Sequence, residues 1–292
     1  MPRFGYLAWV EARPVVQLIF QLRFATGVVF GTGSAIGHNF RPGIAVAALG
    51  WLAATWAIYL INGVTDIAED RENGSQRPIA QGRLPLSAAT TICWILVALA
   101  VACCLFVSVH MAVLVAIMLA VGWAYSMGPC PFKMSMPGFL ASVTTLGLVT
   151  YLAGWCAAGG EWSNPLLIFG IVMSLWMGLV GSTKDLPDTE GDRLAGRRTP
   201  PIVFGQQRAR ALIAILASVV GWTFLIASAT ARWAGGLLPA AVVVCTGSIA
   251  VSVVLLSAIS RGDRRVRRRP YRVFMTTQYA THTTLLSANV VP

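Results

Sequence analysis

Acidic residues are scarce in this chain. Only 11 of its 292 residues are Asp or Glu, and charged residues of both signs make up 11% of the sequence. A soluble domain carries about 25% charged residues. The hydrophobic fraction is 56%, and the mean hydropathy is +0.70. These values exclude an ordinary soluble domain and predict a chain that lies mostly within a membrane.

The sequence also has no CxxC motif. Most of the six cysteines lie in apolar runs. Such cysteines are typical small buried hydrophobic residues. We therefore expect neither a disulfide framework nor a cysteine metal site at Cys93, Cys103, Cys104, Cys130, Cys156 and Cys245.

About nine apolar runs are long enough to cross a bilayer as helices. A lipid-exposed backbone must satisfy its own hydrogen bonds, which favours helices, and a barrel would show short alternating segments instead. The first run is expected to be a retained span and not a signal peptide. The predicted spans are Val15–Ile36, Ile44–Ile67, Ala88–Val107, Met111–Met127, Phe139–Gly159, Leu166–Thr183, Ala211–Ala231, Gly236–Ile259 and a weaker Val273–Val291.

Positive charge is distributed unevenly between the two sets of loops. Most of the 22 Lys and Arg residues lie in the N-terminal segment and in the loops predicted on the same side of the membrane. The loops on the other side hold only Arg41 and Arg232, and Arg23 lies inside the first span. The positive-inside rule then predicts a cytoplasmic N-terminus, with both acidic stretches on the cytoplasmic side. This distribution argues against nucleic-acid binding, despite the net charge of +11. The run Arg261–Arg269 is predicted to set topology and to attract anionic lipid.

Eight of the eleven acids lie in two short stretches. The first is NGVTDIAEDRENGSQRP, residues 62–78, and the second is STKDLPDTEGDR, residues 182–193. Each alone could be a solvated end of a span, but two such stretches in register, each followed by a basic loop, favour a function. Acids within a span are costly and tend to be functional. The eight are Asp66, Glu69, Asp70, Glu72, Asp185, Asp188, Glu190 and Asp192.

A shift of 122 positions superimposes the two stretches. Asp66 then falls on Asp188, Asp70 on Asp192, and Arg71 on Arg193. The pattern predicts two related four-helix bundles plus one helix within a single domain, 1–292. The first repeat is 1–135, the second is 136–260, and 261–292 holds the basic loop and the last helix. Such repeats often place a site at their interface.

The spacing of the acids predicts a metal site. Residues four apart share one helix face, and two carboxylates there repel each other unless a cation lies between them. Mg²⁺ prefers oxygen ligands and often binds through one or two carboxylates plus substrate phosphates. Asn62, one turn before Asp66, adds an amide to that face. Two facing clusters are thus predicted to hold two or three ions and a diphosphate.

Basic residues beside the acids suit phosphate oxygens. Each basic residue could equally serve only to set the orientation of the spans in the membrane. Arg23 is the exception, because an arginine inside a span needs a carboxylate or a phosphate as its partner. The candidates are Arg71, Arg77, Lys133, Lys184, Arg193 and Arg23, with Tyr125 nearby.

At these residues the sequence resembles the UbiA superfamily of intramembrane prenyltransferases. The resemblance rests on NxxxDxxxD at 62–70, DxxDxEGD at 185–192, the stretch from Tyr125 to Lys133, and RPI after the first motif. It implies nine transmembrane helices around a central cavity that opens to the membrane. In one departure, many members read Asn-Asp where this chain has Asn62-Gly63, which bears on the type of acceptor.

The resemblance implies Mg²⁺-dependent ionisation of a prenyl diphosphate. It implies that Asn62, Asp66, Asp70, Asp188 and Asp192 hold the metal and diphosphate, with help from Asp185. Phosphate contacts would come from Lys133, Arg77, Lys184 and Arg23, with Arg71 beside them, and Tyr125 would orient one oxygen.

The chemistry requires a dry cavity, because water would quench the allylic cation. Aromatic faces could stabilise that cation, with Trp56, Tyr59, Tyr151, Trp155 and Trp176 as candidates. The leading prediction is transfer to an aromatic, quinone-precursor or other lipophilic acceptor. The alternatives are a terpene cyclase without acceptor and a cation-coupled transporter. Gln278, Tyr279 and His282 could bind an acceptor, take a proton, or bond neighbouring helices.

Overall fold

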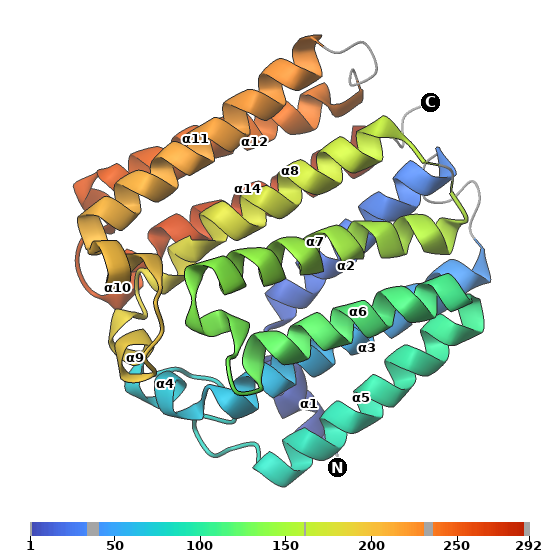
Figure 1. Cartoon of the computed structure of the whole chain (residues 1–292), viewed down its shortest axis with the longest axis horizontal. Coiled ribbons are helices and arrows are strands. Elements are labelled where there is room, and N and C mark those ends of the chain that lie inside the picture. The colour runs from blue at the N-terminus through green and yellow to red at the C-terminus, as the bar shows by residue number, and fades with distance from the viewer. Residues whose placement is uncertain (1, 34–40, 161, 231–235, 289–292) are drawn as a thin grey trace.

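The computed structural model describes residues 2–33, 41–160, 162–230 and 236–288, and this part of the chain contains no strand. Nine long helices lie side by side in it (Figure 1), which confirms the prediction of an all-helical membrane fold. The predicted span ends at Ile36, Ala231 and Val291, and Arg232, lie outside the described residues. The long helices are α2 (Pro14–Thr32), α3 (Pro42–Thr65), α5 (Leu86–Val107), α6 (Val109–Ser126), α7 (Met136–Ala158), α8 (Asn164–Val180), α11 (Gln206–Thr230), α12 (Leu238–Leu256) and α14 (Arg269–Ala288).

Eight of these helices are apolar and long enough to cross a membrane, and α14 is the exception. Its buried face carries Thr277, Gln278, Thr281 and His282, as the weaker ninth run predicted. The helix packs against α12 and α2, so its polar side chains face protein and not lipid. Burial against neighbouring helices is how a polar helix is accommodated at membrane depth.

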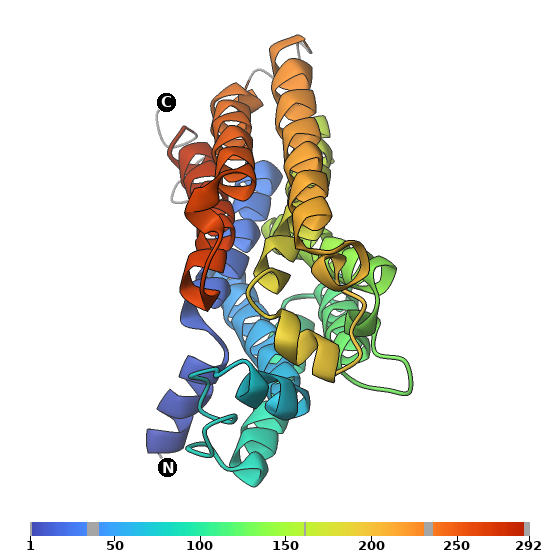
Figure 2. The same cartoon turned by 90° about the vertical axis from the view of Figure 1, so that its left-hand side faces the viewer.

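The short helices gather at one end of the bundle. There α4 and α9 contact each other (Figure 1), and the view from this end shows the short helices in front of the long ones (Figure 2). The chain order is span, span, short acidic helix, span, span in each half. The short elements are α1 (Pro2–Glu11), α4 (Ile67–Glu72), η1 (Phe132–Met134), η2 (Gly181–Asp185), α9 (Thr189–Leu194), α10 (Pro200–Phe204), η4 (Ala258–Ser260) and α13 (Arg264–Arg267).

Each acidic stretch bends at its first shared aspartate. Asp66 (φ −98°, ψ 13°) ends α3 and precedes α4, and Asp188 (φ −108°, ψ 19°) precedes α9 in the same way. The two turns that follow also match, with Gly74 at φ 59° and Gly196 at φ 71°. Asn62 and Asp70 therefore lie on two different helices, α3 and α4, and the prediction that Asn62, Asp66 and Asp70 share one helix face was too simple. The local backbone repeats over these residues, and the larger two-bundle repeat stays a prediction.

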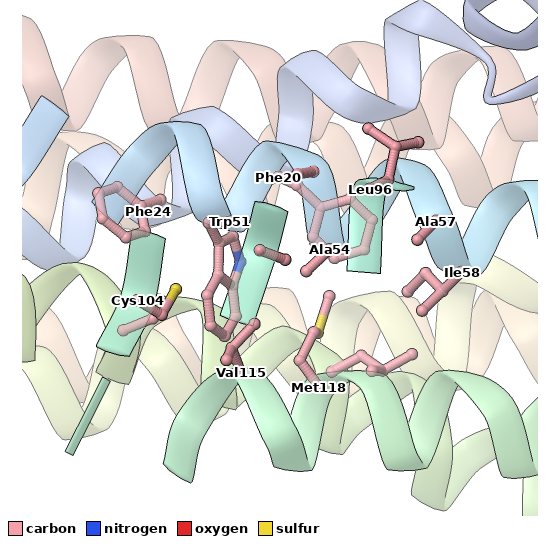
Figure 3. Packing of buried hydrophobic residues seen from close by; sticks show 14 of the residues in the cluster. Phe20, Phe24, Trp51, Ala54, Ala57, Ile58, Leu96, Cys104, Val115 and Met118 are labelled. Carbon is pink, nitrogen blue, oxygen red and sulfur yellow. The ribbon is translucent and has the colours of Figure 1, made fainter. Parts of the chain in front are cut away.

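The core of the first half is built around Trp51, which is fully buried (Figure 3). Its indole Nε1 donates to the Thr150 hydroxyl at 3.3 Å, which satisfies the one polar atom of the ring. A second cluster in the other half surrounds Phe169 and Trp176. The halves meet where α2 packs against α7, and glycines permit the close approach. A Cβ on Gly154 would overlap the Phe24 carbonyl oxygen.

We predict that Gly154→Ala lowers the free energy of unfolding by about 1–3 kcal/mol, the usual cost of overpacking. The neighbouring atoms are backbone atoms of Phe24 and Val28, which cannot rotate away. Thermal unfolding in detergent measures the effect. Gly43→Ala is the control, because nothing lies within 4 Å of a Cβ there. Equal midpoints for the two variants would contradict the close packing of α2 on α7.

Candidate active site

A cavity of about 180 Å³ lies at the end of the bundle that carries α4 and α9. That space corresponds to roughly a dozen water-sized positions, which is room for a ligand rather than for one ordered water. Both acidic stretches contribute to its wall, so the predicted facing of the two clusters is observed. The acids that line it are Asp66, Glu69, Asp70, Asp185, Asp188 and Asp192.

A short contact between α4 and α9 sets the distance between the two stretches. The backbone amide of Gly191 donates to the Asn73 side-chain oxygen at 3.1 Å. Residue 191 has no side chain, and a Cβ there would lie 2.7 Å from the Glu69 carbonyl oxygen. The glycine of the EGD sequence therefore lets the two short helices touch.

Arg197 links the carboxylates of the two halves. Its Nη2 atom lies 3.0 Å from Asp66 Oδ1 and also pairs with Glu69, while Nη1 lies 3.8 Å from Asp192 Oδ1. The Arg197 side chain is only 8% exposed. A buried guanidinium between carboxylates from both stretches neutralises part of their mutual repulsion. Sequence reasoning missed this role, because Arg197 looked like one loop charge among many.

Each of four further cations holds one cavity acid. Lys133 pairs with Asp66 and donates to the Thr65 hydroxyl at 3.0 Å. Lys184 lies 2.8 Å from Asp185, and Arg77 lies 2.8 Å from Asp70. Arg264 of α13 lies 2.7 Å from Asp188. The run Arg261–Arg269 was predicted to set topology and to attract anionic lipid, and that interpretation was incomplete because Arg264 of α13 also contacts the site.

Three arginines line the cavity without an ion pair to any described acid: Arg13, Arg23 and Arg268. Arg13 has φ 57° and is the single non-glycine residue with positive φ in the described part of the chain. Arg23, 1% exposed, donates to Gln278 and has two further nitrogens without hydrogen bonds. Of the two partners predicted as alternatives for Arg23, no carboxylate among the described residues pairs with it, and a phosphate stays a prediction.

The rest of the cavity wall is apolar and aromatic. Ile19, Ile58, Val143, Leu146, Met177 and Met275 line it, together with Phe20, Tyr59, Tyr125, Phe139, Tyr271 and Phe274. Of the predicted aromatic candidates, only Tyr59 is among these. The indole of Trp56 donates to Ala8 O, Tyr151 OH bonds His282 at 2.6 Å, Trp155 packs against Trp162, and Trp176 stacks on Phe274. Those four rings pack helices together.

The structure brings most of the predicted site residues to the cavity wall. Lys133 and Arg77 are buried behind it, each bonded to a lining carboxylate. Arg71 was misplaced: it is exposed, and its Nε donates to Ala80 O at 2.9 Å. Gln278 lines the cavity, whereas Tyr279 donates to Val15 O. The predicted residues on the wall are Asn62, Asp66, Asp70, Asp185, Asp188, Asp192, Tyr59, Tyr125, Lys184 and Arg23.

The acids of the two stretches differ in their electrostatic surroundings. Burial alone would raise the pKa of Asp66, but Arg197 and Lys133 outweigh it and hold the pKa below its usual range. Burial, together with the Asp185 charge, raises the pKa of Asp192 to about 7. Asp192 Oδ2 is buried without a hydrogen bond. This oxygen is therefore buried with neither a hydrogen bond nor an ion pair to a described residue.

Within the described residues, no three Asp, Glu, His or Cys side chains are grouped closely enough to form one metal shell. Lysine and arginine nitrogens occupy the positions between the carboxylates, as the ion pairs show. The donor set consists of carboxylate and amide oxygens, which suit a hard divalent cation. A divalent cation that bound to these carboxylates would displace Arg197 or a neighbouring lysine or arginine from its ion pair.

A membrane-embedded bundle with facing acidic stretches defines a class of intramembrane enzyme. Residues 24–277 match the UbiA prenyltransferase family, and the chain belongs to that family. The digeranylgeranylglyceryl phosphate synthase of Halobacterium salinarum is 31% identical over 230 residues, which cover 74% of this chain and 80% of that protein. The predicted family and enzyme class are confirmed: this is an integral membrane prenyltransferase.

Two further relatives bear on fold and activity. A UbiA homologue from Archaeoglobus fulgidus, in a structure bound to GPP and Mg²⁺, has a TM-score of 0.71 at 18% identity, covering 95% of this chain and 99% of that one. The fold therefore extends over nearly the whole chain. The diterpene cyclase eriG of Hericium erinaceus is 44% identical, but over only 45 residues, or 15% of each chain.

We predict that Arg197→Ala destabilises the protein by about 3 kcal/mol in buffer without divalent cations, because it leaves buried carboxylates unneutralised. Chemical or thermal unfolding in detergent measures the loss. Arg198→Ala is the matched control, since that neighbouring side chain is exposed. If the two variants unfold alike, Arg197 does not neutralise the facing stretches.

Proposed function

We propose that this chain transfers an isoprenyl group from a prenyl diphosphate to a lipophilic acceptor within the membrane, with Mg²⁺ as cofactor. One observation carries the proposal: two facing acidic stretches line a cavity whose wall also carries basic residues and many apolar and aromatic side chains. That combination suits a ligand with a diphosphate at one end and a hydrocarbon at the other. The Archaeoglobus fulgidus homologue, bound to GPP and Mg²⁺, supports the same assignment.

The acidic end is proposed to hold the metal. Asn62, Asp66, Asp70, Asp188 and Asp192 line the cavity, as does Asp185, which pairs with Lys184. The unpaired Asp192 Oδ2 and the oxygen-rich donor set fit a divalent cation. When bound, Mg²⁺ supplies Lewis-acid stabilisation of the departing diphosphate.

The cations around the site are proposed to bind diphosphate oxygens. When the carboxylates turn to the metal, Arg197, Lys133 and Lys184 lose their present acids and become free for phosphate. Arg13 and Arg268 line the cavity without an acid of their own, so they need no such exchange. Positioned cations of this kind stabilise the charge that develops on a leaving group. Tyr125, on the same wall, is placed to donate to one oxygen.

The hydrocarbon part of the donor is proposed to lie against the apolar wall. Phe20, Tyr59, Phe139 and Phe274 line it and can stabilise an allylic cation through their ring faces. Helix α2 packs against α7 and α14 on this side, and we propose that this packing limits the access of water. Dryness protects the cation until the acceptor attacks and loses a proton.

The acceptor and the membrane orientation are also proposals. Relatives are named for glyceryl phosphate and aromatic prenylation, so an aromatic, quinone-precursor or other lipophilic acceptor is proposed. The short eriG match keeps an acceptor-free cyclase as the second candidate. The basic loops support a cytoplasmic N-terminus and a cytoplasmic acidic end. The paired backbone geometry of Asp66 and Asp188 supports two related repeats, 1–135 and 136–260.

We predict that purified protein in liposomes releases diphosphate from prenyl diphosphates when Mg²⁺ is present, and that EDTA stops the release. Product that forms only with an added aromatic or glyceryl phosphate acceptor identifies a transferase. A hydrocarbon or terpene alcohol formed without acceptor identifies the cyclase. Ion flux without any turnover would contradict both enzymatic proposals.

We predict that Asp66→Asn and Asp188→Asn each lower turnover roughly 100-fold or more, the scale of losing one preorganised electrostatic contact. Both substitutions keep side-chain volume and remove charge. Glu72→Gln is the control, because Glu72 belongs to the same acidic stretch but is exposed. Near-normal rates in either aspartate variant, with the protein correctly folded, would count against the metal cluster.

A further inference from the structure

Glu11 lies at the end of α1, outside the two acidic stretches, yet it is 0% exposed. Its Oε1 lies 2.7 Å from Arg77 Nε, and its Oε2 accepts the Ile79 backbone amide at 2.8 Å. Both carboxylate oxygens are thus engaged. Burial raises the pKa of Glu11, while Arg77 and the Ile79 amide favour the ionised form.

Arg77 joins Glu11 to the cavity. Its Nε faces Glu11, and its Nη1 lies 2.8 Å from Oδ2 of Asp70, which lines the cavity. Its Nη2 donates to Tyr59 O at 3.3 Å and to Glu11 O at 3.4 Å. The guanidinium is therefore held on three sides, and only one of its carboxylates belongs to the site.

Gly63 explains why Glu11 can reach this position. A Cβ on residue 63 would overlap Glu11 Oε1 and lie 2.8 Å from Arg77 Nη2. Any side chain there would displace the carboxylate of α1. The chain therefore has a carboxylate beside residue 63, but that carboxylate comes from position 11.

We propose that Glu11 is a positioning residue of the metal site: it holds Arg77 in place, so that Asp70 is free to turn from Arg77 to a divalent cation. The inference rests on the proposed function. With Asp70 as its single acid, Arg77 would become an uncompensated buried charge whenever Asp70 bound the metal. With Glu11 present, Arg77 keeps an ion pair in both states. Glu11 therefore favours metal binding without touching the metal.

The test measures Mn²⁺ binding by electron paramagnetic resonance on the full chain in detergent, with inorganic diphosphate present. Glu11→Gln keeps the shape of the side chain and removes its charge. We expect the apparent Kd for Mn²⁺ to rise roughly tenfold or more, as for other residues that orient metal ligands. In assays, the Mg²⁺ concentration for half-maximal rate should rise by a similar factor, with a smaller change in kcat at saturating Mg²⁺.

A control separates this role from simple docking of α1. Trp9 packs edge-on against Trp56 with ring centroids 5.0 Å apart and has no contact with Arg77. Trp9→Ala should therefore lower the unfolding midpoint without weakening Mn²⁺ binding. An equal loss of Mn²⁺ affinity in Trp9→Ala and Glu11→Gln would overturn the proposal.

A second test moves the carboxylate from position 11 to position 63, so that the result does not depend on one variant. Glu11→Ala should lose Mn²⁺ affinity, and Gly63→Asp alone should be destabilised by the overlap with Glu11. The double variant Glu11→Ala/Gly63→Asp supplies the carboxylate from α3 and should regain most of the affinity. No recovery, or wild-type affinity in Glu11→Gln, would overturn this inference alone. Absence of Mn²⁺ binding by the wild-type chain would overturn the metal site of the proposed function as well.

Discussion

The constraint behind this architecture is the repulsion among six carboxylates that share one cavity wall. Buried like charges cannot stay ionised together without cations between them. The protein supplies those cations from its own chain, and among the described residues Arg197 alone forms ion pairs with acids of both stretches. The structure thus compensates the carboxylates while it keeps the oxygen ligands that the proposed metal would need. In the proposed metal-bound state, some carboxylates would exchange a basic side chain for the divalent cation.

The same requirement accounts for the segments that converge on one end of the bundle. Arg264 brings the α12–α14 connection over Asp188, and Glu11 brings α1 against Arg77. These segments are far apart in sequence. Leu7 and Ala8 of α1 also belong to the apolar core around Trp51, so hydrophobic packing holds α1 together with the Glu11–Arg77 ion pair. Ion pairs at the cavity therefore add to the hydrophobic packing that orders the long helices.

Sequence alone predicted the parts of the structure that depend on local pattern. The length of the apolar runs located the long helices. The 122-residue shift matched the two acidic stretches, which line the same cavity in the structure. The shared helix face predicted for Asn62, Asp66 and Asp70 was too simple, because spacing cannot reveal the bend at Asp66. Arg197 and Glu11 were not predicted, since their importance comes from residues about 130 and 66 positions away in sequence. Neither carries a local signal that separates it from other charged residues near a span.

Arg23 shows how charge and dryness can coexist in the cavity. It lies on a membrane-spanning helix, lines the cavity, and has Gln278 as its hydrogen-bond acceptor, with two nitrogens left without one. A buried cation without an acid is costly, and the Phe20 ring, whose centroid lies 5.4 Å from the Arg23 guanidinium carbon, offsets part of that cost. In the proposed function, an anionic oxygen of the ligand would offset the rest. The wall around Arg23 thus combines one cation with the apolar and aromatic side chains that the hydrocarbon part of the ligand would contact.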